Sequence, residues 1–219
     1  ASGIPGIDAS NHFINGRPSK GLGFMWRNNL TQFSKFITYD SDRIIGLEIC
    51  GSNHKLLILN VYLPFEHPDN FEEYLHCLGK INSIIQTSDT NHVIVCGDFN
   101  ACFSKSFGHE LIEFCNENNL FISDKLLMLP TCNGEQPYTY ISEAHNTCSW
   151  LDHCVSTHSS HVNIYDFNIL DNLTFYDHIP ITFKYNITFN TGFVNKSANS
   201  NDSSKGRCNY LTNWLNVSQ

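Results

Sequence analysis

The sequence predicts an α/β protein with at least two β-sheets. Nine short segments are rich in apolar and β-branched residues and are bounded by turn signals, as β-strands are. Two segments with helical spacing of apolar residues interrupt this series. Nine strands are many for one sheet, and interleaved strands and helices are typical of α/β proteins. A chain of 219 residues, 41% of them apolar, can bury one sizeable core, so one domain is the default interpretation.

The first part of the chain is expected to be a loop followed by three strands. Glycines and prolines punctuate residues 1–20, and apolar segments follow at 22–26, 43–49 and 55–63. Residues 51–53 (GSN) separate the last two segments and favour a hairpin. The nearly unbroken apolar run of the third segment indicates a strand that is buried on both faces.

Two helices and six further strands are expected in the rest of the domain. The first helix begins with Asp69 as its cap and Glu72 in a capping-box-like position, and it extends to about residue 87. The second helix covers about residues 109–117. The remaining strands are expected at 92–96, 121–123, 138–142, 149–155, 162–170 and 179–185.

The composition changes after about residue 190, where Asn, Ser, Lys and Gly dominate. Such a segment is typical of a linker or tail. We therefore expect one domain over residues 1–189 and a polar linker or tail over 190–219. No run of 18 apolar residues and no signal peptide are visible, so no membrane span is expected. Nine cysteines without a CxxC pair favour reduced thiols in an intracellular, nuclear or cytoplasmic, protein that is not secreted.

The charge balance is acidic, with a formal net charge of -8 and a pI near 5.7. This balance argues against non-specific binding of nucleic acid. A local basic face is nevertheless compatible with a negative total, and the salt dependence of binding would report it. Six basic residues lie in loops or at strand ends near the motifs described next: Arg17, Lys20, Arg27, Lys35, Arg43 and Lys105.

Polar groups follow directly after several predicted strands, where a rigid sheet often holds catalytic side chains. After residues 92–96, Asp98 can hold or deprotonate a water molecule, and Asn100 can donate to a phosphate oxygen. The alternative is an ordinary turn, because Gly, Asp and Asn are turn residues. In SWLDH (149–153), Asp152 is costly to bury unless it is paired, and a histidine is its natural partner. The alternative is a strand-edge acid that faces water.

Two further motifs have the same design. In YDHIPI (176–181), Asp177 and His178 stand at a loop-to-strand junction, which suits metal binding together with protonation or charge stabilisation. The alternative is a loop pair without a partner. In NVYLP (60–64), the hydroxyl of Tyr62 needs a partner if it is buried, and a phosphate oxygen would serve. The alternative is a core tyrosine.

The four motifs, in this order and each at a strand end, resemble the endonuclease/exonuclease/phosphatase superfamily over about residues 20–185. A finer resemblance is to the endonuclease domain of non-LTR (LINE-type) retrotransposons, in which this domain precedes a reverse transcriptase. It is carried by GRPSKGLGFMWRNNL, RIIGLEI, LLILNVYLP, YTYISEAHNTCSWLDHCVST and YDHIPI. The resemblance implies a DNase I-like, four-layer α/β sandwich of two mixed β-sheets packed face to face, with helices outside.

The resemblance also implies an enzyme that nicks one DNA strand and leaves a 3′-hydroxyl that can prime reverse transcription. Asp98 would orient and activate the attacking water, and Asn100 and Tyr62 would contact the phosphate. His178, oriented by Asp152, would stabilise charge on the scissile phosphate or take part in proton transfer.

The resemblance assigns the divalent metal, Mg²⁺ or Mn²⁺, to Asp177 and Asp98, and carboxylate oxygens suit Mg²⁺. The principal metal ligand of the family is a Glu on an early strand, which has no match here. We expect that Glu and the N-terminal strands to lie upstream of Ala1. Three histidines that are close in the sequence are interpreted as surface or strand residues rather than zinc ligands: His153, His158 and His161.

Two alternative functions remain open at this point. One is another phosphodiesterase or phosphatase of the superfamily, acting on a lipid, inositol or RNA substrate, because substrate choice depends on loops around a shared site. The other is a decayed or domesticated domain without catalysis. The unmatched Glu favours it, as does Tyr176, which stands where the family usually has Ser.

Overall fold

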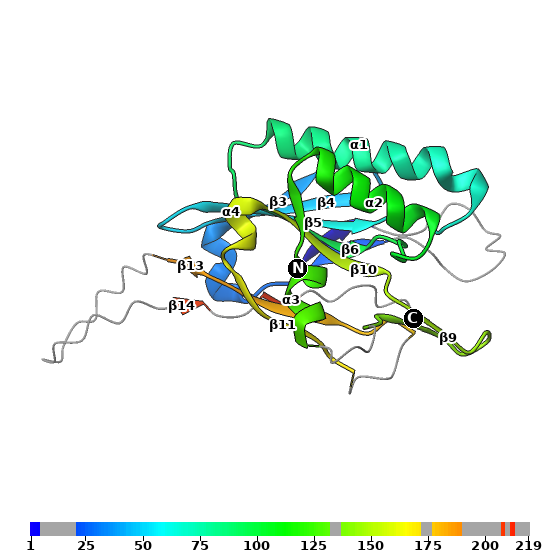
Figure 1. Ribbon diagram of the computed structural model, residues 1–219. Coiled ribbons are helices and arrows are strands. Elements are labelled where there is room, and N and C mark those ends of the chain that lie inside the picture. Colours follow the sequence, from blue (N-terminus) through cyan, green and yellow to red (C-terminus); the bar gives the residue numbers. More distant parts are fainter. Residues whose placement is uncertain (5–20, 132–136, 172–176, 190–206, 209–210, 213–219) are drawn as a thin grey trace, which may run out of the picture.

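The computed structural model describes residues 1–4, 21–131, 137–171, 177–189, 207–208 and 211–212 (Figure 1). A six-stranded mixed sheet forms its centre, in which every neighbouring pair is antiparallel except the parallel pair β5 and β6. In order across the sheet, the strands are β3 (Ser34–Thr38), β4 (Ile44–Cys50), β5 (Lys55–Tyr62), β6 (Val93–Asp98), β10 (Asp152–Thr157) and β7 (Leu120–Ile122). The prediction of a mixed α/β fold is therefore confirmed.

Two long helices cover one face of this sheet. Helix α1 (Phe71–Thr87) connects the parallel strands β5 and β6, which need such a crossover, and α2 (Ser106–Glu117) follows β6. Tyr74 of α1 and Leu111 of α2 share one buried apolar cluster with residues of β5, including Leu59. Figure 1 shows both helices on the same side of the sheet.

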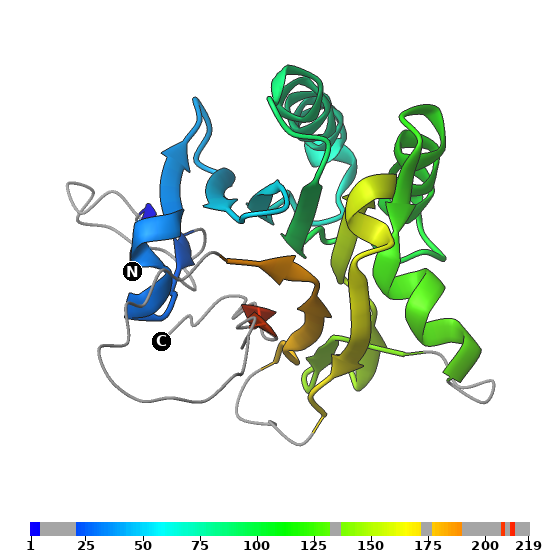
Figure 2. The same ribbon diagram turned by 90° about the vertical axis from the view of Figure 1, so that its left-hand side faces the viewer.

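Short strands lie against the other face. A second buried cluster joins Ile58 of β5 and Cys96 of β6 to Phe183 and other residues of the small sheets. In Figure 2 the orange strands lie on the side of the central sheet opposite α1 and α2. The small sheets contain β1 (Ser2–Ile4) with β2 (Leu22–Phe24), β11 (Ile164–Ile169) with β12 (Ile181–Tyr185) and β15 (Leu211–Thr212), β13 (Ile187–Thr188) with β14 (Arg207–Cys208), and β8 (Tyr140–Ser142) with β9 (Thr147–Ser149).

The two clusters explain why β5 is apolar along nearly its whole length. Its successive side chains point to opposite faces, so Leu57 and Leu59 join the cluster under the helices, whereas Leu56 and Ile58 join the other. The predicted burial of this strand on both faces is confirmed, with six consecutive buried residues from Leu56 to Val61.

Several predicted boundaries were wrong. The cap of α1 is Asn70, after a 3-10 turn at Pro68–Asn70, so Asp69 does not cap the helix. The expected strand at 149–155 is divided into β9 and β10, with Trp150 and Leu151 between them.

Some elements were not predicted at all. These are the strands β1, β3, β13, β14 and β15, the helices α3 (Ser123–Met128) and α4 (His158–His161), and the 3-10 helices η1 (Asn28–Phe33), η2 (Pro68–Asn70) and η3 (Leu129–Thr131). Strand β3 was not predicted because it lacks an alternating apolar pattern. It lies at the edge of the sheet, pairs with β4, and has no fully buried residue.

Most of the predicted polar tail lies outside the described residues. Apart from the strands β14 and β15, residues 190–219 lie outside the described residues, and so does Tyr176. No helix in the described ranges is long and apolar enough to cross a membrane. Cys96 and Cys154 are buried, Cys50 is exposed, and all three are free thiols.

Candidate active site

Three of the predicted site residues lie side by side across the central sheet. Asp98 is the last residue of β6 and pairs with Tyr62, the last residue of the parallel strand β5. On its other side, Asp98 pairs with Asp152, the first residue of the antiparallel strand β10. The strand register therefore brings together motifs that are separated by 36 to 54 positions in the sequence.

Gly97 allows β6 to approach β5 closely next to the site. Its φ is +152°, and a Cβ atom at this position would lie 2.0 Å from the carbonyl oxygen of Val61. Only glycine avoids that contact. The sequence suggested a tight turn here, but the residue lies within the strand, and close backbone approach is the reason for the glycine.

Asn100 holds the carboxylate of Asp98 in place. Its backbone adopts a left-handed conformation with φ of 50°, which asparagine tolerates better than most residues. Its backbone N–H donates to Oδ1 of Asp98 at 2.9 Å. Its side-chain amide donates to the carbonyl oxygen of Leu63 at 2.9 Å and to Oδ2 of Asp98 at 3.3 Å. Asn100 thus links the ends of β5 and β6.

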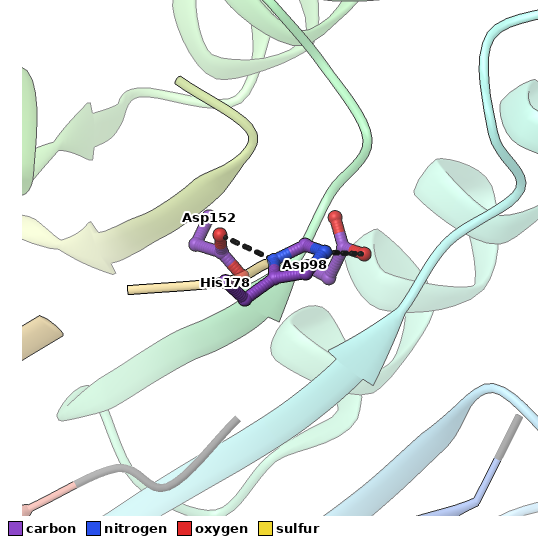
Figure 3. A group of neighbouring side chains, drawn as sticks. All are labelled: Asp98, Asp152 and His178. Atoms are coloured by element: carbon purple, nitrogen blue, oxygen red, sulfur yellow. Dashed lines mark hydrogen bonds and ion pairs between the residues drawn. The ribbon is translucent and has the colours of Figure 1, made fainter. Parts of the chain in front are cut away.

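His178 lies between the two buried carboxylates (Figure 3). Its Nδ1 donates to Oδ2 of Asp152 at 2.9 Å, and its Nε2 faces Oδ2 of Asp98 at 3.8 Å. The side chain of His178 is 18% exposed, whereas Asp98 and Asp152 are almost completely enclosed. The histidine that pairs with Asp152 therefore comes from a motif 26 positions away, and not from the adjacent His153.

Thr139 is a part of the site that the sequence did not reveal. Its side-chain oxygen accepts hydrogen bonds from the backbone N–H groups of Leu151 and Asp152, at 3.0 and 2.9 Å. Its own carbonyl oxygen accepts from Ile179, the residue after His178. Thr139 therefore connects the two segments that carry Asp152 and His178. No motif marks it, because a threonine between two tyrosines reads as an ordinary strand residue.

Burial and charge shift the pKa values of both titratable groups that face each other. Burial, followed by the neighbouring charge of Asp152, raises the pKa of Asp98 to about 7, although His178 and the Asn100 N–H act in the opposite direction. Burial disfavours a charged His178, but the hydrogen bond and charge of Asp152, with the charges of Asp98 and Asp177, raise its pKa to about 9. Both pKa shifts favour a protonated His178 beside a carboxylate that binds a proton more readily than an ordinary aspartate does.

The cluster has the donor atoms that a divalent cation requires. Asp98 and Asp152 offer carboxylate oxygens, and the candidate ligand atoms of these two residues and of His178 lie within 4.8 Å of one another. A protonated His178 has no free lone pair, so it would lie beside the cation rather than bind it. Oδ1 of Asp152 is buried and has no hydrogen-bond partner, so its lone pairs remain available. Hard carboxylate oxygens suit Mg²⁺ or Mn²⁺. In the described ranges this is the one group of three or more such residues.

Asp177 lies next to this cluster in the sequence but is not a member of it. Its carbonyl oxygen accepts from the N–H of Ile141 in β8, and Tyr140 of the same strand pairs with His178. The ring of Tyr140 lies 5.0 Å from that of His178 between centroids. Strand β8 therefore holds the segment that carries both predicted residues. The role of Asp177 as a metal ligand stays a prediction.

Two of the predicted basic residues are engaged in ion pairs. Arg43 contacts Glu73 at 2.7 Å and donates to the carbonyl oxygen of Tyr62, and Lys105 lies 3.7 Å from Glu66. These contacts offset their charge near the site. Arg27 and Lys35 are exposed, whereas Arg17 and Lys20 lie outside the described residues.

Comparisons with known proteins agree on the fold. A family model described as endonuclease-reverse transcriptase matches residues 56–182. A comparison with curated protein sequences gives no match.

Several solved structures share the fold at low sequence identity. The endonuclease domain of TRAS1, a telomere-specific non-LTR retrotransposon, has a TM-score of 0.54 and 18% identity, over 70% of this chain and 67% of that one. An AP endonuclease from Archaeoglobus fulgidus has a TM-score of 0.53 and 17% identity, over 69% and 70%. The 3′ phosphatase NExo from Neisseria, bound to a product DNA hairpin, has a TM-score of 0.52 and 14% identity, over 67% and 66%. The chain therefore spans about two thirds of each of these structures and shares their DNase I-like fold.

Proposed function

Because the chain belongs to the endonuclease-reverse transcriptase family, within the endonuclease/exonuclease/phosphatase superfamily, we propose that it is a metal-dependent endonuclease that nicks DNA. The observation that carries this proposal is the contact series from Asp152 through His178 to Asp98. Two carboxylates and an imidazole, gathered at strand ends and partly open to solvent, suit hydrolysis of a phosphodiester bond. The TRAS1 structure is an endonuclease domain of a retrotransposon and the NExo structure holds a product DNA hairpin, and both support DNA as the substrate.

Asp98 is the proposed group that orients and activates the attacking water. A general base works best when its pKa lies near the working pH, and the pKa of Asp98 is raised to about 7. The two Asn100 donors fix this carboxylate, so that one face of it stays directed toward His178. Tyr62, one strand away, is proposed to contact the phosphate.

His178 is the proposed group that stabilises charge on the scissile phosphate. As an imidazolium with Nδ1 bound to Asp152, it presents the N–H of Nε2 toward the space beside Asp98. A fixed, charged donor of this kind is worth more in a buried site than in water. Asp152 is proposed to set the orientation and the charge of this ring.

Asp98 and Asp177 are the proposed metal ligands, and the free Oδ1 of Asp152 adds a further candidate. A divalent metal, when bound, supplies Lewis acidity toward the phosphate and stabilises the leaving oxygen. We also propose the four-layer sandwich of the family for the whole domain, and a 3′-hydroxyl product that can prime reverse transcription. This activity requires a location with access to DNA.

The direct test is nicking of supercoiled plasmid in Mg²⁺ by the wild type, Asp98→Ala and His178→Ala. Loss of the base or of the charged donor is expected to slow nicking by about 100- to 10,000-fold. Asp69→Ala is the matched control, because this carboxylate is 87% exposed and lies outside the site. Equal nicking by all four proteins would exclude the proposed roles.

A second candidate is hydrolysis of another phosphate ester, such as a lipid, inositol or RNA ester. The net charge of -8 and the ion-paired Arg43 and Lys105 favour it over DNA. Cleavage of such an ester without plasmid nicking, and its loss in Asp98→Ala, would select this function instead.

A further inference from the structure

A second aspartate–histidine pair lies directly behind the site. His153 follows Asp152 on β10, so the two side chains point to opposite faces of the sheet. His153 is completely buried, with Nδ1 2.8 Å from Oδ2 of Asp124 and Nε2 2.8 Å from the carbonyl oxygen of Ala101. A carboxylate and a carbonyl both accept, so both ring nitrogens donate and the ring is an imidazolium. The prediction of a surface or strand residue is confirmed for His153, which lies on β10.

Every side-chain oxygen and nitrogen atom of this pair has a hydrogen-bond partner, and the pair has no surface exposed to water. The second oxygen of Asp124 accepts from the backbone N–H of Cys154 at 3.1 Å, so both carboxylate oxygens are engaged. Phe103 and Trp150 pack on the imidazole, with ring centroids 4.5 and 5.9 Å away. Asp124 has no exposed surface either. The pair has no access to a substrate and cannot take part in the chemistry directly.

The position of the pair connects three segments around the site. Asp124 belongs to α3, His153 belongs to the strand that begins with Asp152, and Ala101 follows Asn100 directly. The bond from Nε2 to Ala101 therefore fixes the far end of the turn whose near end is Asp98. Asn100, inside that turn, is the residue that orients the Asp98 carboxylate.

We propose that His153, held by Asp124, is a positioning residue that fixes the turn from Asp98 to Ala101 against β10, so that Asp98 stays aligned with Asp152 and His178. This inference rests on the proposed function. A buried ion pair contributes little net stability, and apolar residues of similar volume often stabilise a core as well or better. An ion pair at this place is therefore better explained by the geometry that it imposes than by the stability that it adds.

Two isosteric substitutions separate positioning from stability. In His153→Gln the amide nitrogen reaches the place of Nε2 and still donates to Ala101, but the bond to Asp124 is lost. In His153→Asn the amide nitrogen reaches the place of Nδ1 and still donates to Asp124, but the bond to Ala101 is lost. His153→Gln leaves the buried carboxylate of Asp124 without its partner, whereas His153→Asn leaves only the neutral carbonyl of Ala101 unpaired. His153→Gln is therefore expected to have the lower thermal midpoint, the opposite order to the expected loss of kcat.

The test is steady-state nicking of plasmid in Mg²⁺ together with the thermal midpoint of each variant. For His153→Asn we expect kcat to fall by about 10- to 100-fold with KM unchanged, as for other partners that orient an active-site ligand. For His153→Gln we expect kcat to stay much closer to the wild type. A loss of kcat that is equal in both variants, or that follows the thermal midpoint alone, would overturn the inference.

A second measurement keeps the inference separate from the proposed function. If the wild type does not nick DNA, or if Asp98→Ala nicks equally well, the proposed function fails, and hydrogen exchange at the Asn100 amide then decides about His153. Exchange is expected to be faster in His153→Asn than in His153→Gln, while the Leu57 amide, which donates to the carbonyl of His92, is unchanged. Equal protection of Asn100 in both variants would overturn the positioning role.

Discussion

Two aspartate–histidine pairs each have one member on β10, at the neighbouring residues Asp152 and His153. The two pairs have similar contact distances but differ in exposure and in hydrogen bonding. Asp152 and His178 approach to 2.9 Å, and Asp124 and His153 to 2.8 Å. The first pair keeps Oδ1 of Asp152 without a partner, leaves Nε2 of His178 facing Asp98, and exposes 18% of the His178 side chain. The second pair has no exposed surface and no free hydrogen-bonding atom.

The difference shows that the pairing itself does not make a site reactive. When all their oxygen and nitrogen atoms are hydrogen-bonded and buried, a carboxylate and an imidazole act as a rigid connection between segments. With one oxygen unpaired and one nitrogen directed to an accessible space, the same two groups can bind a cation or a phosphate. The alternation of side chains along a strand separates these two uses by one residue.

The largest expected effect is on catalysis. Asp152→Asn is expected to lower kcat for plasmid nicking by about 100- to 10,000-fold, because the amide no longer holds His178 in its charged form. Asp124→Asn is the matched control, since an amide can accept from Cys154 and donate to His153 while the bond to Ala101 persists. We expect its kcat to stay within about tenfold of the wild type. If kcat for nicking fell equally in Asp152→Asn and Asp124→Asn, the two pairs would not differ in their contribution to catalysis.

The next effect is on stability, and here the larger loss is expected at the enclosed pair of Asp124 and His153 rather than at the active site. Asp124→Ala leaves the charge of His153 buried without its partner and is expected to lower the free energy of unfolding by about 3–5 kcal/mol. Asp98→Asn is expected to leave this free energy unchanged or to raise it, because it removes the repulsion from Asp152. Urea unfolding measures both, and a larger loss in Asp98→Asn would contradict the comparison.

Metal binding is expected to stabilise the protein through the site around Asp98, and not through the enclosed pair of Asp124 and His153. A divalent cation at 100 times its dissociation constant adds about 2.7 kcal/mol to the free energy of unfolding. The thermal midpoint of the wild type and of Asp124→Asn should therefore rise in excess Mg²⁺ or Mn²⁺. No such rise is expected for Asp98→Asn, and an undiminished rise in that variant would place the cation elsewhere.

A pH dependence of stability is also expected from His178. Its pKa is raised to about 9 in the folded protein, above the ordinary value of 6.5, so the folded state binds the proton more tightly. This contribution is complete below pH 6.5 and is lost as the pH rises toward 9. Without metal, the wild type should therefore lose stability relative to His178→Gln between pH 6.5 and 9. Parallel profiles in urea unfolding would show that the shift is absent.

The sequence alone indicates the pair of Asp152 and His178 but not the enclosed pair of Asp124 and His153. Asp98, Asp152 and His178 each follow or begin a recognisable strand, and the order of their motifs carries the family resemblance. Thr139 and Asp124 have no such context: each acts through a contact across 13 or 29 positions with a residue on or beside β10. Such contacts depend on strand register and on the placement of α3, neither of which leaves a local pattern.

We propose that the divalent cation binds at Asp98, beside Asp152 and His178, with Asp177 as a second ligand. Paramagnetic broadening of NMR signals by Mn²⁺ tests it most directly, since it needs neither a substrate nor turnover. We expect low Mn²⁺ to broaden the signals of Asp98, Asn100 and His178 first, and Asp98→Asn to abolish this effect. Broadening that begins at another part of the chain, or that is unchanged in Asp98→Asn, would contradict it.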